Sequence, residues 1–116
     1  MNNTLGTIES MFALRAWCRD NLPTDNSLIA YDLILLIAIA GEKKQQLTIK
    51  QLFSSLPHSY TAVRQHYNRF IREGWLAHQS DEKDGRIKYI QPTDKFRQTV
   101  KNYSNAANHI FLNKPQ

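Results

Sequence analysis

Between positions 59 and 73, polar side chains able to pair with DNA bases recur at helical spacing. At 100° per residue, one side of such a helix collects Thr61, Arg64, Gln65, Asn68, Arg69 and Arg72. Arg pairs with guanine through two hydrogen bonds, Gln and Asn pair with adenine in the same way, and Thr contacts a thymine methyl group or a phosphate. Glu73 is the only acidic residue of the segment, whereas an ordinary solvated helix mixes Glu with Lys. The spacing therefore favours a base-reading helix over a merely solvated one.

Position along this helix separates two roles. Recognition helices place their N-terminal half in the major groove. The predicted base-reading residues are accordingly Thr61, Arg64, Gln65 and Asn68. Arg69 and Arg72 lie further along and are predicted phosphate contacts. Three more phosphate contacts are predicted near helix starts: Thr48, Lys50 and Ser59.

A second basic cluster, in residues 80–88, surrounds the dipeptide Asp84-Gly85, which is typical of a β-hairpin turn. Its predicted contacts to phosphates or the minor groove are Lys83, Arg86 and Lys88. The acids of the same segment oppose a polyanion unless they are neutralised. We expect Asp84 or Asp81 to pair with Arg86, which would hold the turn and direct the guanidinium outward. The alternative is a plain surface hairpin whose ion pairs contribute little.

Helices earlier in the chain must support these side chains. Apolar residues recur at near-helical spacing over 7–21 and predict a first helix. Residues 28–40 are apolar at nearly every position, and Gly41 follows them as a typical helix C-terminus. The run is shorter than the roughly 20 residues of a membrane span, and a helix that is apolar on all sides is a buried one. It is predicted to be the central core helix.

Pro57 separates a helix over 48–56 from one that Ser59 caps and Gly74 ends, which is typical of a helix-turn-helix. The predicted buried stripe of the second of these helices is Tyr60, Val63, Tyr67 and Phe70. Runs rich in β-branched and aromatic residues over 75–79 and 86–91 then predict a hairpin, and Thr93 caps a final helix. A helix-turn-helix followed directly by a hairpin is a winged helix. The predicted fold class is therefore mainly α with a small β-hairpin wing, flanked by N- and C-terminal helices.

With 116 residues, the chain predicts one domain, 1–116. Its parts are N-terminal and core helices over 1–44, the helix-turn-helix plus wing over 45–92, and a C-terminal dimerisation helix over 93–116. The net charge of +5 is localised: residues 1–56 carry five bases and five acids, whereas the remainder carries ten bases and five acids. A localised basic half is expected of a protein that binds nucleic acid.

The last helix carries apolar residues spaced as a heptad seam, which packs on the chain's own first helix or on a partner's. Two-fold pairing would double a small DNA interface, so we predict a homodimer through residues 5–22 and 95–112. The predicted interface residues are Ile8, Phe12, Trp17, Phe96, Val100, Tyr103, Ala107 and Ile110.

The composition excludes several classes of protein. The single cysteine, Cys18, rules out an internal disulfide, and the N-terminus lacks the pattern of a signal peptide, so a cytoplasmic protein is expected. No glycine-rich phosphate loop, nucleophile elbow or paired carboxylates indicate an enzyme, and no histidine spacing indicates a metal. His58 is interpreted as a surface residue. No cofactor and no membrane association are predicted.

The stretch from Leu52 to Thr93 resembles the winged helix-turn-helix of the MarR family of bacterial regulators. The family's wing follows the pattern Asp-x-x-Asp-x-Arg, and this chain has Asp81-Glu82-Lys83-Asp84-Gly85-Arg86, with Ile90 and Thr93 at the corresponding offsets. The resemblance implies homodimers on pseudo-palindromic DNA, with Arg86 in or near the minor groove. This chain is shorter than typical members and has one C-terminal helix where they have two.

We therefore expect a sequence-specific double-stranded DNA-binding protein, a dimeric transcriptional regulator with recognition helix 59–73 in the major groove and wing 80–88 at the minor groove. One alternative is a winged-helix adaptor or anti-repressor that binds protein, which would more often expose aromatic side chains on the recognition helix. Another is a plasmid replication or partition factor. Nothing in the sequence supports a small-molecule effector. Peroxide sensing through Cys18 is the less favoured interpretation of that residue, compared with a small buried hydrophobe.

Overall fold

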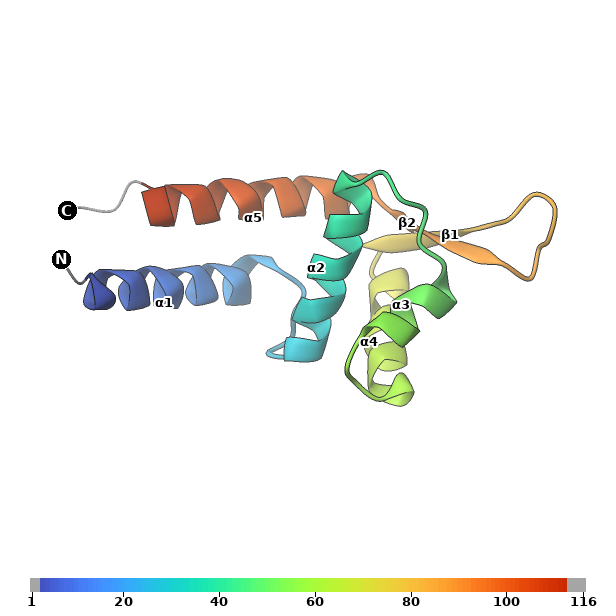
Figure 1. The fold of residues 1–116 in the computed structure, drawn as a ribbon, viewed down its shortest axis with the longest axis horizontal. Helices are drawn as coiled ribbons and strands as arrows, with labels where there is room; N and C mark the ends of the chain where they lie inside the picture. The colour runs from blue at the N-terminus through green and yellow to red at the C-terminus, as the bar shows by residue number, and fades with distance from the viewer. Residues whose placement is uncertain (1–2, 113–116) are drawn as a thin grey trace.

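The computed structural model describes residues 3–112 and contains the elements in the predicted order (Figure 1). They are α1 (Thr4–Asn21), α2 (Leu28–Glu42), α3 (Ile49–Ser55), α4 (Tyr60–Arg72), β1 (Leu76–Ser80), β2 (Lys88–Pro92) and α5 (Asp94–Leu112). The winged helix predicted from the sequence is therefore confirmed. The described part of the molecule is elongated, with extents of 57 × 26 × 25 Å. Figure 1 shows that the long dimension arises because α1 and α5 run side by side away from the remaining elements. We call these two helices the arm, and α2–α4 with the hairpin the head.

The core of the head lies between α2 and α4. Ala30, Leu33 and Ile34 of α2 are at most 1% exposed, and Val63 and Phe70 of α4 are fully buried. The small side chain of Ala30 allows close approach of neighbouring elements, and the branched residues fill the space between the helices. Burial of these side chains fixes which side of α4 remains in water.

The prediction that α2 is buried on all sides was wrong at its outer face. Leu28 and Ile39 are 64% and 50% exposed, because no element covers that side among the described residues. The helix also continues through Gly41 to Glu42 instead of ending before it. Lys44, rather than Gly41, takes the left-handed backbone conformation that commonly follows the end of a helix, with φ 56°.

Side-chain caps set where the supporting helices begin. The Thr48 hydroxyl accepts from the Gln51 amide and the Gln51 side chain accepts from the Thr48 amide, which is a complete capping box. Ser59 caps α4 through the Ala62 amide, as predicted. Gly74 follows α4 at φ +79°, a conformation that favours glycine and turns the chain into β1.

The hairpin is anchored to the head at its base. β1 and β2 pair antiparallel, with Leu76 opposite Pro92 and Ser80 opposite Lys88. Pro92 stands at the end of the strand, where its missing amide is least needed. The Ile90 amide donates to the Leu47 carbonyl, and Thr48 forms a bridge with Tyr89. These contacts hold the start of α3 against the hairpin and so fix the wing relative to the helices of the head.

Four predicted dimer-interface residues, Trp17, Phe96, Val100 and Tyr103, pack against the core of their own chain. Phe96 is 4% exposed in the core of the head. Trp17 of α1 stacks on Tyr103 of α5 with ring centroids 5.7 Å apart, and the Tyr103 hydroxyl hydrogen-bonds to that of Tyr31. Of the two partners that the heptad spacing allows, the chain's own helices are the ones contacted at these positions. They form the inside of the arm.

Replacing a side chain at the α2–α4 contact tests this description of the core. Phe70→Ala removes a fully buried ring and should lower the free energy of unfolding by about 3–5 kcal/mol, because a cavity remains. Urea denaturation followed by circular dichroism measures the change. Leu28→Ala, on the exposed side of α2, is the matched control and should cost less than about 1 kcal/mol. Equal costs for the two variants would contradict the burial described for Phe70 of α4 and the exposure described for Leu28 of α2.

Candidate nucleic-acid interface

The outer face of α4 is open to solvent and carries the predicted base-reading residues. Thr61, Arg64, Gln65 and Asn68 are all exposed, as is Arg72 one turn further on. Within residues 3–112, no hydrogen bond or ion pair engages these five side chains with another side chain. Arg64 alone has a ring contact, with its guanidinium carbon 5.9 Å from the centre of the Tyr60 ring. The donors and acceptors of this face are thus available to an external partner.

Arg69 does not join that surface, although the sequence predicted it to contact phosphate. Its side chain is only 17% exposed and donates to the Pro23 carbonyl at 2.8 Å. The guanidinium lies 4.8 Å from the centre of the Phe70 ring and 3.3 Å from a carboxylate oxygen of Glu73. Arg69 therefore connects α4 to the loop between α1 and α2. Its guanidinium is engaged within the fold and is not a candidate DNA contact.

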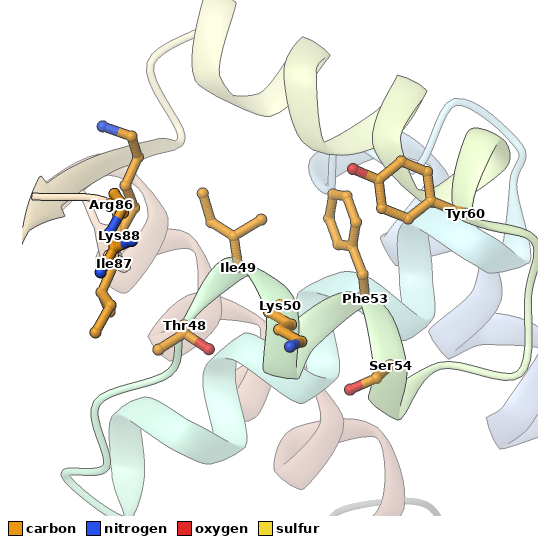
Figure 2. A pocket seen from close by; sticks show the side chains of 9 residues that line it. All are labelled: Thr48, Ile49, Lys50, Phe53, Ser54, Tyr60, Arg86, Ile87 and Lys88. Carbon is orange, nitrogen blue, oxygen red and sulfur yellow. The ribbon is translucent and has the colours of Figure 1, made fainter.

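Tyr60, predicted to lie in the buried stripe of α4, is 59% exposed. Its ring packs edge-on against Phe53 of α3, with centroids 4.9 Å apart. It borders a hollow of about 710 Å³ between α3, the start of α4 and the wing (Figure 2). The hollow is lined by Thr48, Ile49, Lys50, Phe53, Ser54, Tyr60, Arg86, Ile87 and Lys88, which include three cations and no acid.

The wing turn is held by the carboxylates that the sequence placed beside Arg86. Asp84 accepts from Arg86 Nε at 2.9 Å and Nη2 at 3.0 Å, which confirms the expected pair. The Arg86 side chain is nonetheless 91% exposed and directed outward. Asp81 accepts from the amides of Lys83 and Asp84 and, at 3.1 Å, from the Tyr89 hydroxyl. The acids thus brace the turn, and the Arg86 guanidinium offsets the charge of Asp84 toward an approaching polyanion.

These hydrogen bonds shift the pKa values of the turn. Bonds from the Asp84 and Lys83 amides and from the Tyr89 hydroxyl lower the pKa of the Asp81 carboxyl. The side-chain bond from Arg86 lowers the pKa of Asp84, and the same bond raises the pKa of the Arg86 guanidinium. Both carboxylates are therefore ionised at neutral pH, and Arg86 carries its full charge.

The other predicted phosphate contacts surround the hollow or the wing. Lys50 and Lys88 line the hollow, and Lys88 Nζ lies 3.4 Å from the Ser80 hydroxyl. Lys83 is exposed at the wing tip. The hydroxyls of Thr48 and Ser59 accept capping bonds at the starts of α3 and α4, respectively. Figure 2 shows Lys50, Arg86 and Lys88 on the two sides of the hollow, from α3 and from the wing.

Outside this surface, the structure corrects the interpretation of His58. His58, taken as a surface residue, is half-buried, and its Nε2 lies 2.7 Å from a carboxylate oxygen of Asp32 on α2. No local pattern signals this pair, because its members are far apart in sequence.

Cys18 is buried, and burial is the main cause that raises the pKa of its thiol. A raised pKa disfavours the reactive thiolate that peroxide sensing requires.

The described residues offer no grouping of three or more His, Cys, Asp or Glu side chains that could hold a metal ion. None of the helices within residues 3–112 is long and apolar enough to cross a membrane.

No family model and no curated protein matches the sequence, but solved structures share its fold. The transcriptional regulator Tm0710 from Thermotoga maritima is 16% identical with a TM-score of 0.66, over 95% of this chain and 70% of that one. A MarR mutant from E. coli, solved with operator DNA, is 14% identical with a TM-score of 0.60, over 97% and 79%. The heme sensor PefR from Streptococcus agalactiae is 14% identical with a TM-score of 0.59, over 100% and 83%. The resemblance to MarR-type regulators is thereby confirmed for the fold.

The bracing of the wing predicts how it responds to acid. Because the folded pKa of Asp81 lies below its ordinary value of 3.8, its bonds should stabilise the turn at all pH values above 3.8. That contribution should be lost only as the pH falls further, through the lowered pKa. The amide signals of Lys83 and Asp84, followed by NMR during an acid titration, report the transition. A midpoint at or above 3.8 would contradict the hydrogen bonding described for Asp81.

Proposed function

We propose that this chain is a sequence-specific double-stranded DNA-binding protein that acts as a dimeric transcriptional regulator. The observation that carries the proposal is the exposed face of α4. Its polar and basic side chains make no hydrogen bond or ion pair with another side chain among residues 3–112, and the helix contains no acid. The fold shared with a MarR protein solved with operator DNA supports it. The role is binding rather than catalysis, with the bacterial cytoplasm as the proposed compartment and neither a cofactor nor a small-molecule effector required.

In this proposal α4 enters the major groove and the wing lies at the adjacent minor groove. Thr61, Arg64, Gln65 and Asn68 read base edges, because they occupy the first half of the helix and make no competing bonds. Arg86 is presented to the minor groove by its pair with Asp84, which fixes the guanidinium before DNA arrives. Such preorganisation lowers the entropy lost on binding.

Phosphates are contacted on both sides of these elements. Arg72, Lys50, Lys83 and Lys88 supply the charge, all from exposed positions. Thr48 and Ser59 hold the starts of α3 and α4, and as exposed or half-exposed hydroxyl groups they remain candidates for a donated bond to phosphate. The hollow between α3, the start of α4 and the wing would follow the sugar–phosphate backbone between the two grooves.

A second copy of this chain is the proposed partner of the arm. Leu5, Ile8 and Phe12 of α1 are 73%, 56% and 77% exposed, and they recur at helical spacing on the side away from α5. Exposed apolar residues gathered in this way indicate an interface. Ile8 and Phe12 therefore stay in the proposed dimer interface, together with the half-buried Ala107 and Ile110 of α5.

One observation favours a second candidate, the protein-binding adaptor or anti-repressor. An exposed aromatic ring at the start of α4, beside a hollow that Ile49, Phe53 and Ile87 help to line, is what a protein-binding surface would present. The cations around the hollow and the polar face of α4 favour DNA over this candidate. Binding measurements separate the two, because an adaptor would not bind duplex DNA.

Salt dependence of DNA binding is the first test. A labelled random-sequence duplex, titrated by fluorescence anisotropy, should bind with micromolar affinity at about 50 mM salt and lose most of that affinity by about 200 mM. The steep loss follows from release of counterions by several phosphate contacts. Absence of binding at low salt would overturn the DNA proposal and favour the adaptor.

Two substitutions then separate base reading from backbone contact. On a duplex selected for tight binding, Arg64→Ala should cost about 1–3 kcal/mol, and it should cost far less on random DNA. Arg86→Ala should weaken binding to both and reduce the salt slope by about one contact if the guanidinium meets the backbone. Lys101→Ala, which removes an exposed cation of α5, is the matched control and should change neither. Negligible effects of Arg64→Ala and Arg86→Ala together would refute the docking arrangement.

The dimer is tested by mass. Light scattering at micromolar concentration should give twice the 13.5 kDa of one chain, and Phe12→Asp should reduce the mass to one chain because it places a charge in the apolar interface. Ala13→Asp, an exposed position next to it, is the control. A wild-type mass of one chain would contradict the proposed interface.

A further inference from the structure

The aromatic side chain at the first position of α4 is not accounted for by the fold. Tyr60 is 59% exposed, yet the other members of its predicted stripe, Val63, Tyr67 and Phe70, are at most 2% exposed. A large ring left in water at the start of a helix gains no stability from burial. Its position next to Ser59, the cap of the recognition helix, places it at the front of the proposed DNA-binding surface.

The ring is nevertheless held in place. Phe53 packs edge-on against it, with centroids 4.9 Å apart, and Phe53 is in turn packed edge-on against the buried Tyr67. The Arg64 guanidinium lies 5.9 Å from the centre of the Tyr60 ring, one helical turn along. Figure 2 shows Tyr60 and Phe53 together at one end of the hollow, opposite the wing residues. The ring is therefore a fixed apolar surface beside a predicted guanine-reading arginine.

Charge around the ring indicates which partner it faces. Lys50, Arg86 and Lys88 surround the hollow that Tyr60 borders, and none of its lining residues is acidic. Phosphates on either side would pair with these cations, which leaves the apolar ring to meet the bases or sugars between them. In the major groove, the one strongly apolar group on a base edge is the methyl group of thymine.

We propose that Tyr60 is a specificity-determining residue that contacts the 5-methyl group of a thymine in the DNA site. This inference rests on the proposed function and adds to it a base preference at the edge of the recognition helix. The contact uses the face or edge of the ring rather than its hydroxyl. Arg64, which lies against the same ring, is positioned by it for the neighbouring base.

The test replaces the methyl group and the ring in turn. A tight-binding duplex is selected from random sequence with the wild-type protein, and each thymine of the site is then replaced singly by deoxyuridine, which lacks only the methyl group. At one position the wild-type affinity should fall about fourfold, the value of one buried methyl-sized group. Tyr60→Ala should bind the thymine and deoxyuridine duplexes equally at that position.

Tyr60→Phe is the matched control, because it keeps the ring and removes the hydroxyl, and it should retain the fourfold discrimination. Thermal unfolding of all three proteins checks that the substitutions leave the fold intact, as expected for an exposed side chain. The discrimination ratio separates base recognition from a structural role, since a loosened helix would weaken both duplexes alike.

The outcomes are distinct. Equal discrimination by the wild type and Tyr60→Ala, insensitivity of the wild type to deoxyuridine at every position, or loss of discrimination in Tyr60→Phe would overturn the inference while the proposed function stands. Failure of the wild type to select any duplex would overturn the proposed function and this inference with it.

Discussion

Val63, Tyr67 and Phe70 bury one side of α4 against the centre of the head, where α2 supplies a row of aliphatic side chains. This packing fixes the rotation of α4 about its own axis. Once these three residues face inward, Thr61, Arg64, Gln65 and Asn68 have to face water, because the helical period leaves them on the opposite side. A rotation of one residue, 100°, would exchange polar for apolar side chains in the core. Burial on one side of the helix thus determines the chemistry that the other side presents.

The wing depends on the same packing through a different set of bonds. Leu76 and Ile90 of the two strands reach into the core. The backbone bond from the Ile90 amide to the Leu47 carbonyl, at the isolated β-bridge of Thr48 with Tyr89, joins the hairpin to the start of α3. The turn itself has no core and is held by Asp81 and Asp84 instead. Burial holds the hairpin at its base, and charge-assisted bonds hold it at its tip. Together they keep Arg86 in one place.

The sequence predicted the elements well because local signals mark them: caps at Thr48 and Ser59, Gly74 at the end of α4, and a period that changes from helical to alternating. It failed where a tertiary partner decides. The spacing of Tyr60 matches the buried stripe, but the ring packs against Phe53 of α3 rather than within the core, so most of it stays exposed. Phe96 and Tyr103 show the same limit, since heptad spacing is identical for packing within and between chains. The His58–Asp32 pair joins segments with no shared pattern and was invisible to local reasoning.

Arg69 has a mechanical consequence. Its bond to the Pro23 carbonyl connects α4 to the loop that leaves α1, while Lys95 at the start of α5 donates to the Glu73 carbonyl just after α4. Both helices of the arm are thus fastened to the same end of α4. A change in the angle between the arm and α4 would have to stretch or break these bonds, so they couple the orientation of the exposed polar face of α4 to that of the arm.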